Sequence, residues 1–149
     1  MAETAHPGAH SILEHDHASA WLGISVLSVG EGKATLQMTL RKEMLNGFGM
    51  AHGGMVFAFA DSAFALACNP ATGSAETITV ASGVDINFLR PAFEHQLLTA
   101  VAQRRSSAGR SGIYDIEIFA ADPGAPLPGA LIAEFRGRSR TIPRKKDTP

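Results

Sequence analysis

The stretch HGGMVFAFADSAFALACN, residues 52–69, decides the fold of this chain. Its apolar interior holds only two polar residues, Asp61 and Ser62, and Pro70 follows directly and blocks a further helical turn. We therefore predict one helix over Met55–Cys68. A helix this apolar must be covered by a membrane or by the protein's own sheet. Because it is shorter than the ~20 apolar residues that a bilayer crossing needs, we interpret it as a soluble core helix.

Length, charge and cysteine content limit the classes of protein that fit. The chain has 149 residues, which indicates one domain, and its 13 Lys and Arg against 14 Asp and Glu leave a formal charge of -1. This balance favours neither nucleic acid nor a membrane as the partner. The single Cys68 excludes an internal disulfide, and residues 1–20 lack a signal-peptide pattern, so we expect a cytoplasmic protein.

Residues 1–20 read as an N-terminal segment with a short helix over Ser11–Trp21. We expect Ser11 to cap this helix with Glu14 as its capping-box partner. The apolar side chains of the helix would seal one end of the core; they are Ile12, Leu13 and Trp21.

Four histidines precede or enter this short helix: His6, His10, His15 and His17. Their spacing matches no standard zinc arrangement, and no cysteine accompanies them. We interpret them as solvated side chains and expect no metal.

Several β-rich runs, separated by turn residues, accompany the central helix. The runs are 22–29, 33–40, 77–88, 96–107, 112–121 and 130–142. Short connections favour antiparallel pairing. We predict an α+β fold over residues 21–142, in which a curved antiparallel sheet of five to six strands wraps one long central helix, followed by a disordered tail over 143–149. A sheet covers only one side of that helix, so we also expect self-association.

Two features of the helix could take part in a chemical reaction. Gly53 and Gly54 lie at its N-terminus, where unpaired N–H groups and the positive end of the dipole suit an oxyanion, although the glycines would also serve simple loop packing. Asp61 lies in an apolar surface that raises the pKa of a carboxyl group, as expected of a general base or a nucleophile, although a structural hydrogen bond remains an alternative.

The spacing of these features sets a constraint. Gly53 and Asp61 are eight residues apart, about 12 Å of helical rise, so one carbonyl group cannot contact both. Either one of them has no part in the chemistry, or the site is shared between the helix N-terminus of one protomer and Asp61 of another. We take the shared site as the working hypothesis.

The segments LNGFGMAHGG (45–54) and FAFADSAFA (57–65) strongly resemble the hot-dog-fold acyl-CoA thioesterases, and most closely their phenylacetate-pathway branch. Further similar segments are VAS (80–82), DINFLRP (85–91), SGIYDIEI (111–118) and FRGRS (135–139), so that the resemblance spans about residues 20–142. It implies hydrolysis of an acyl-CoA thioester without a metal or cofactor. It also implies a homodimer as the smallest active unit and a homotetramer of paired dimers.

The resemblance also implies roles for individual residues. Gly53 would offer its N–H to the thioester carbonyl, and Asp61 of the neighbouring protomer would activate water or attack directly. Asn46 would orient water or the thioester, and His52 would shape the loop. The loop departs from the family pattern at Phe48 and Met50, where relatives carry polar residues, and this departure would alter acyl specificity.

Coenzyme A, as part of the substrate, would bind near the turn before the penultimate strand. The resemblance points to Gly109, Arg110 and Ser111, to Ser82 in a similar segment, and to Arg90 and Arg138 as phosphate partners. A solvated face is an equally good interpretation of each arginine. Two other functions remain as alternatives: an acyl-thioester hydratase or dehydratase of the same fold, and a non-catalytic acyl-CoA-binding protein.

Overall fold

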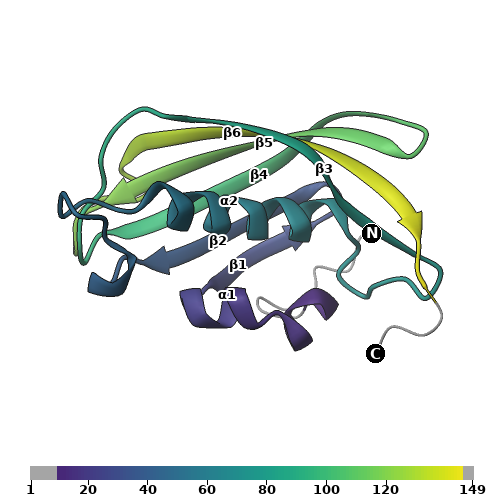
Figure 1. Ribbon diagram of the computed structural model, residues 1–149, viewed down its shortest axis with the longest axis horizontal. Helices are drawn as coiled ribbons and strands as arrows, with labels where there is room; N and C mark the ends of the chain where they lie inside the picture. Colours follow the sequence, from purple (N-terminus) through teal and green to yellow (C-terminus); the bar gives the residue numbers. More distant parts are fainter. Residues whose placement is uncertain (1–9, 146–149) are drawn as a thin grey trace.

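The computed structural model describes residues 10–145, which form one antiparallel sheet wrapped around a helix (Figure 1). The sheet order is β1-β2-β4-β5-β6-β3, which confirms the predicted α+β fold. The strands are β1 (Ser25–Gly30), β2 (Lys33–Thr39), β3 (Thr77–Phe88), β4 (Leu97–Ala108), β5 (Ser111–Ala121) and β6 (Ala130–Pro143). Although β3 and β4 are consecutive in the chain, β3 lies at the sheet edge beside β6, so short spacing does not make these two neighbours.

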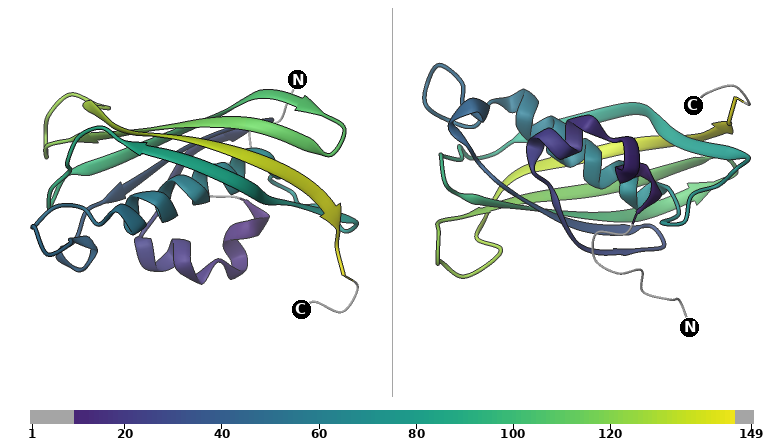
Figure 2. Two further views of the ribbon diagram at one scale, coloured as in Figure 1. Left: turned by 45° about the horizontal axis from the view of Figure 1, so that its top comes forward. Right: turned by 90° about the horizontal axis from the view of Figure 1, so that it is seen from below.

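The central helix α2 (Gly53–Cys68) lies against the concave face of the sheet (Figure 2). It begins two residues before the predicted start. Its buried side chains pack into the core with those of the strands; they are Val56, Phe59, Ala60, Ala63, Phe64, Leu66 and Ala67. Phe64 approaches β6 closely because Gly137 has no side chain: a Cβ there would lie 2.8 Å from the ring.

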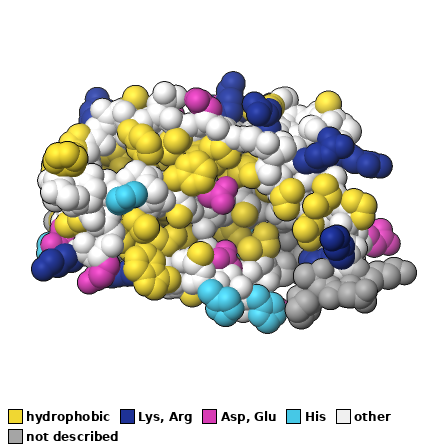
Figure 3. All heavy atoms as spheres, viewed as in Figure 1, with side chains coloured by type: hydrophobic (Ala, Val, Ile, Leu, Met, Phe, Trp, Pro, Cys, Tyr) yellow, Lys and Arg dark blue, Asp and Glu magenta, His cyan; other side chains and the backbone are white. Residues whose placement is uncertain are grey.

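The opposite side of α2 carries an open strip at helical spacing. It comprises Gly54, Phe57, Ala58, Asp61 and Ala65, all exposed or half-buried. On this face of the molecule, hydrophobic side chains spread around a few acidic ones (Figure 3). Strand β3 also has an outer edge that no other strand in residues 10–145 pairs with. The strip and this edge are therefore the surfaces that a second copy could cover.

The N-terminal segment folds as two short helices rather than one. A 3₁₀ helix, η1 (Ser11–His15), is followed by α1 (His17–Leu22). The predicted Ser11 cap is wrong, because the His10 ring accepts a hydrogen bond from the N–H of Ile12 and Asp16 accepts one from that of Ser19. Asp16 thus ends the first helix and begins the second.

Two side chains of this segment are placed differently from the prediction. His10 is buried, with Nε2 3.1 Å from the carbonyl oxygen of Asn69, whereas His15 and His17 are exposed as predicted. Trp21 is 51% exposed, and the Arg41 guanidinium lies 4.8 Å from the centre of its ring. The core is sealed instead by the next residue, Leu22, together with the partly buried Ile12 and Leu13. His6 lies outside the described residues.

Loop 41–51 contains a 3₁₀ turn, η2 (Lys42–Met44), and a bridge between Leu45 and Ala51. In the predicted tail, the N–H of Arg144 donates to the carbonyl of Glu76, and residues 146–149 lie outside the described residues. Within residues 10–145, no helix is long and apolar enough to cross a membrane.

Candidate active site

His52 caps the N-terminus of α2 with its side chain. Its backbone is extended, which makes it the last residue before the helix, and its Nδ1 accepts a hydrogen bond of 2.9 Å from the N–H of Gly54. The carbonyl of His52 accepts the N–H groups of Met55 and Val56. Since Nδ1 is used as an acceptor, the ring holds the first turn of α2.

These contacts leave the N–H of Gly53 available. Among the first four amides of α2 it is the one without an acceptor in residues 10–145. The absence of a side chain also matters, because a Cβ on Gly53 would lie 3.2 Å from the Phe88 ring. A carbonyl oxygen can therefore reach a donor at the positive end of the helix dipole.

Gly53 lines an apolar cavity of about 400 Å³. The cavity lies between the helix N-terminus, the loop before it and the end of β3; its apolar lining includes Met50, Val56, Phe88, Leu89 and Ile132. Two of the predicted site residues, Asn46 and Arg90, share this cavity with Gly53. Its size and lining suit a small apolar group beside a single amide donor.

Asn46 organises the loop that forms one wall of this cavity. Its Oδ1 accepts the N–H groups of Phe48 and Met50 at 2.9 and 3.2 Å, and its own N–H donates to the carbonyl of Met50. Its Nδ2 has no acceptor within residues 10–145 and remains available as a donor. Phe48, at the tip of the loop, is 86% exposed and does not line the cavity, whereas Met50 does.

Asp61 lies at mid-helix on the open strip of α2, outside that cavity. Burial raises the pKa of its carboxyl group, and the negative charge of Asp16 raises it further, which confirms the predicted direction. Because α2 is a continuous helix from Gly53 to Cys68, the separation of about 12 Å between Gly53 and Asp61 holds in the structure. One chain therefore does not bring the donor and the acid together.

A second cavity, of about 350 Å³, lies over the β4–β5 hairpin and contains three of the other predicted binding residues. Ser82, Ser111 and Arg138 line it, together with Ser106, Ser107 and Ser139. Ser82 lies at a bulge in β3 and donates its hydroxyl to the carbonyl of Arg138. A pocket of hydroxyl groups with one guanidinium suits a phosphate or another anion.

The remaining predicted contacts are Gly109 and Arg110, which line neither cavity, and Arg90, which lines the first. Gly109, with φ of 59°, and Arg110 form the exposed turn of the β4–β5 hairpin, next to the second cavity's Ser111. Arg90 donates from Nη1 to the carbonyl of Leu131 at 2.7 Å, so its guanidinium is held at the rim of the first cavity.

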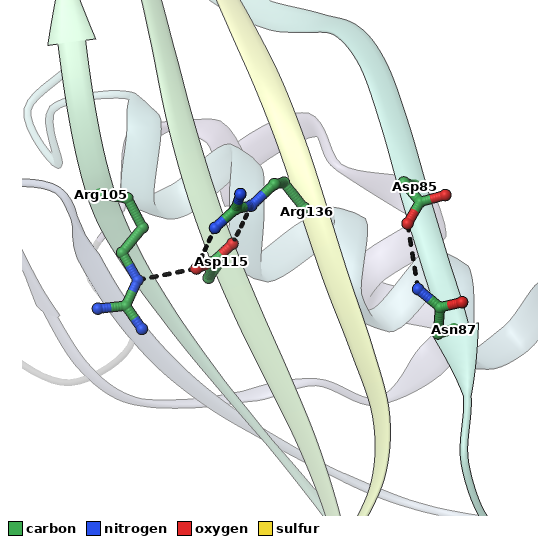
Figure 4. A network of polar contacts seen from close by, with 5 residues as sticks. All are labelled: Asp85, Asn87, Arg105, Asp115 and Arg136. Carbon is green, nitrogen blue, oxygen red and sulfur yellow. Dashed lines mark hydrogen bonds and ion pairs between the residues drawn. The ribbon is translucent and has the colours of Figure 1, made fainter.

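The outer face of the sheet carries a separate charged network (Figure 4). Arg105 and Arg136 both bind Asp115, at 2.8 and 2.7 Å, and link β4, β5 and β6, while Asn87 donates to Asp85 along β3. Hydrogen bonds from Arg136, and next from Arg105, hold the pKa of Asp115 below its ordinary value. We assign this network to sheet stability, because none of its residues lines the cavity at Gly53.

Sequence patterns missed some residues around the site. They are Phe88, whose ring lies against Gly53, and Asp16, whose charge acts on Asp61; no local sequence signal links either of them to the site. Within residues 10–145, no group of three or more His, Cys, Asp and Glu is placed to hold a metal ion.

Comparisons with known proteins identify the family to which this chain is similar. The thioesterase superfamily matches residues 48–126, which include Gly53 and Asp61. The acyl-coenzyme A thioesterase PaaI of Escherichia coli (strain K12) is 42% identical over 142 residues, 95% of this chain and 94% of that protein.

Two solved structures extend the comparison. The E. coli PaaI protein from the phenylacetic acid degradation operon matches with a TM-score of 0.79 at 42% identity and covers 90% of each chain. A mutant of the phenylacetic acid degradation protein PaaI from Thermus thermophilus matches with a TM-score of 0.73 at 31% identity, over 84% of this chain and 98% of that one. These likenesses confirm the predicted hot-dog fold.

Proposed function

This chain belongs to the thioesterase superfamily and is a PaaI-like acyl-CoA thioesterase, and from that premise we propose that it hydrolyses an aryl-acyl-CoA to the free acid and coenzyme A. The proposed substrate is phenylacetyl-CoA or a hydroxylated phenylacetyl-CoA. One observation carries the proposal: the free N–H of Gly53 opens into an apolar cavity of about 400 Å³. In this arrangement the thioester oxygen accepts from Gly53 while the aryl group packs against Phe88 and Val56.

The catalytic carboxylate comes from the neighbouring protomer. Asp61 of one chain faces the carbonyl held at Gly53 of the other, and its carboxylate either removes a proton from the attacking water or attacks the carbonyl carbon itself. In both routes the carbon–sulfur bond breaks, and the coenzyme A thiolate leaves and takes a proton. When water attacks the thioester, water supplies the second oxygen of the product acid. When Asp61 attacks, a mixed anhydride forms, water then hydrolyses it at the Asp61 carbonyl carbon, and the product acid takes its second oxygen from the Asp61 carboxylate. No metal or cofactor takes part, since coenzyme A belongs to the substrate.

The nucleotide end of coenzyme A binds at the second cavity. Arg138 supplies the charge, Ser111 supplies a hydroxyl donor, and Ser82 lines the cavity with its hydroxyl bonded to the carbonyl of Arg138. The Gly109–Arg110 turn adds a second guanidinium close by. Asn46 directs its free Nδ2 toward the thioester or the water. Arg90, at the rim of the first cavity, is a further phosphate contact.

The proposed assembly is a homodimer that forms both sites, with dimers pairing into a homotetramer. The open strip on α2 and the free edge of β3 support the dimer, because residues 10–145 of the single chain leave both uncovered. Each dimer would then contain two equivalent sites related by its two-fold axis.

The decisive assay measures thiol release from phenylacetyl-CoA and from a panel of aryl and short-chain acyl-CoAs. Asp61→Asn should lower kcat by about 10²- to 10⁴-fold, the usual contribution of an acid or base, while the matched control Glu117→Gln on the outer face should not. The protein's own thiol does not disturb the assay, because burial raises the pKa of Cys68 to about 12. No thiol release from any substrate would overturn the proposal and favour an acyl-CoA-binding protein. Hydration of an unsaturated acyl-CoA without thiol release would favour a hydratase.

Isotope incorporation distinguishes the two chemical routes. In a single turnover in ¹⁸O-labelled water, direct attack by Asp61 leaves the label in the protein carboxylate, whereas water attack places it in the released acid. Mass spectrometry of the digested protein and of the acid reads both outcomes.

A further inference from the structure

The short helix α1 brings a second acid to the helix that carries Asp61. Asp16, at the N-terminus of α1, is half-buried, and α1 packs on α2 beside the open strip. Its carboxylate acts electrostatically on the carboxyl group of Asp61. Nothing in the proposed reaction uses Asp16.

A chain of hydrogen bonds fixes this arrangement. Oδ1 of Asp16 accepts the N–H of Ser19 at 3.0 Å, and Oδ2 accepts the Ser19 hydroxyl at 2.6 Å. The same hydroxyl lies 2.7 Å from the hydroxyl of Ser62, the residue next to Asp61 on α2. Ser19 is 2% exposed, so the chain is held inside the contact between the two helices. Asp16 is therefore anchored to the turn of α2 that carries Asp61.

Among the described residues, Asp16 is the one whose charge acts on the Asp61 carboxyl group. On α2 itself, burial raises the pKa of Cys68 to about 12, so its thiol is neutral at pH 7. On β5, burial raises the pKa of Tyr114, which is therefore neutral as well. The β4–β6 cations near mid-sheet, Arg105 and Arg136, bind Asp115 on the outer face. His52 is at the far N-terminus of α2, and Arg104 pairs with Glu31 at the β1–β2 turn.

We propose that Asp16 is a positioning residue for the thioesterase reaction: anchored through Ser19 and Ser62, it holds a second negative charge beside Asp61 and makes the Asp61 carboxylate a stronger base or nucleophile. This inference rests on the proposed role of Asp61. A like charge disfavours ionisation of its neighbour, so the carboxylate that does form binds a proton or a carbonyl carbon more strongly.

Three variants separate the charge of Asp16 from its hydrogen bonds. Asp16→Asn removes the charge but keeps a side-chain oxygen that can cap α1, since Asn is as good an N-cap as Asp. Ser19→Ala breaks the hydrogen-bond chain but keeps the charge. Glu14→Gln removes an exposed acid from the same segment and serves as the control.

Two measurements are needed on each variant. The first is the pH dependence of kcat with phenylacetyl-CoA. The second is the titration of the Asp61 carboxyl carbon by NMR with ¹³C-labelled protein, which does not depend on activity. In Asp16→Asn both the acidic limb of the kcat profile and the Asp61 titration should move to lower pH, and kcat at pH 8 should fall by less than about tenfold. Glu14→Gln should change neither, and Ser19→Ala should move both less than Asp16→Asn does.

The outcomes separate this inference from the proposed function. An Asp61 titration that is the same in Asp16→Asn as in the wild type overturns the inference, whatever the activity. If the titration moves but the kcat profile does not, the charge coupling stands and Asp61 is not the base or nucleophile, which overturns the role of Asp61 in the proposed mechanism. If Asp16→Asn lowers kcat equally at all pH values without moving the titration, Asp16 has only a structural role and the inference is wrong.

Discussion

At the residue scale, the placement of Asp61 conflicts with stability. Burial and the charge of Asp16 raise the pKa of Asp61 above its ordinary value of 3.8, so the native state binds the proton more tightly than the unfolded chain does. The stability that this provides is fully present below pH 3.8 and is lost as the pH rises through the folded-state pKa. At neutral pH the ionised Asp61 therefore destabilises the fold, as expected where function places a charge in an apolar surface.

This conflict gives a prediction for Asp61→Asn. The variant should unfold at a higher urea concentration than the wild type at pH 7, and the difference should shrink as the pH is lowered toward 3.8. Urea titrations followed by circular dichroism at several pH values and one protein concentration measure it. A variant that is less stable than the wild type at pH 7 would show that the Asp61 carboxylate makes a stabilising contact instead.

Some residues of the candidate site could be predicted from the sequence and others could not. Asp61 and Gly53 could be selected from the sequence because each breaks a local pattern, an acid in an apolar run and a glycine pair at a helix start. Asp16 could not be linked to Asp61, because that link runs through a contact between Ser19 and Ser62, 43 residues apart. Likewise, the buried His10 ring contacts the carbonyl of Asn69, which is 59 residues away in the sequence.

At the scale of elements, the contact between α2 and β6 depends on the absence of a side chain at Gly137. A Cβ there would lie 2.8 Å from the Phe64 ring, which in turn packs against Phe135 and Tyr114 at centroid distances of 5.9 and 5.4 Å. We predict that Gly137→Ala lowers the free energy of unfolding by about 1–3 kcal/mol, since overpacking displaces buried rings.

The test of this contact has a matched control and a rescue. Gly30→Ala adds the same methyl group to strand β1, where no neighbouring atom would lie within 4 Å of the new Cβ. This variant should change the free energy of unfolding by less than about 0.5 kcal/mol. Adding Phe64→Leu to Gly137→Ala should recover part of the loss, because the smaller side chain makes room. Equal effects of the two alanine variants would exclude the packing explanation.

Elements were predictable where their signals are local. The prediction for β3 agrees with the structure at both ends, and that for α2 differs by two residues at its start because the cap is a histidine side chain. The break of the N-terminal helix at Asp16 was missed, since an acid inside a polar segment does not by itself indicate a cap. The place of β3 at the sheet edge is a tertiary property that strand spacing does not contain.

At the scale of the whole molecule, α2 and β3 run antiparallel to each other. A position along α2 in the proposed shared site therefore corresponds to a position along β3, which fixes how the β3 edges of two protomers would align. Gly53 lies against Phe88 at one end, and the Asn69 side chain bonds both the N–H and the carbonyl of Thr79 at the other, each at 2.9 Å. If Gly53 and the partner's Asp61 form one site, the two-fold axis passes the helix midway between them, about 6 Å along α2 from Gly53. The same distance along β3 from Phe88 is about two residues, which reaches Ile86.

Pairing of two β3 edges around Ile86 sets Asp85 of one protomer opposite the partner's Asn87. We predict that the variant Asp85→Cys/Asn87→Cys forms interchain disulfides on mild oxidation, because directly opposite side chains on antiparallel strands come within reach of a disulfide. Non-reducing electrophoresis measures the linked dimer, and Cys68 does not compete because burial raises its pKa to about 12.

The matched variant Ala81→Cys/Val84→Cys tests a register centred on the middle of β3, which would move Gly53 away from the partner's Asp61. If only that second variant cross-links, the donor and the acid belong to different sites, and the shared site is wrong even though the chain dimerises through β3.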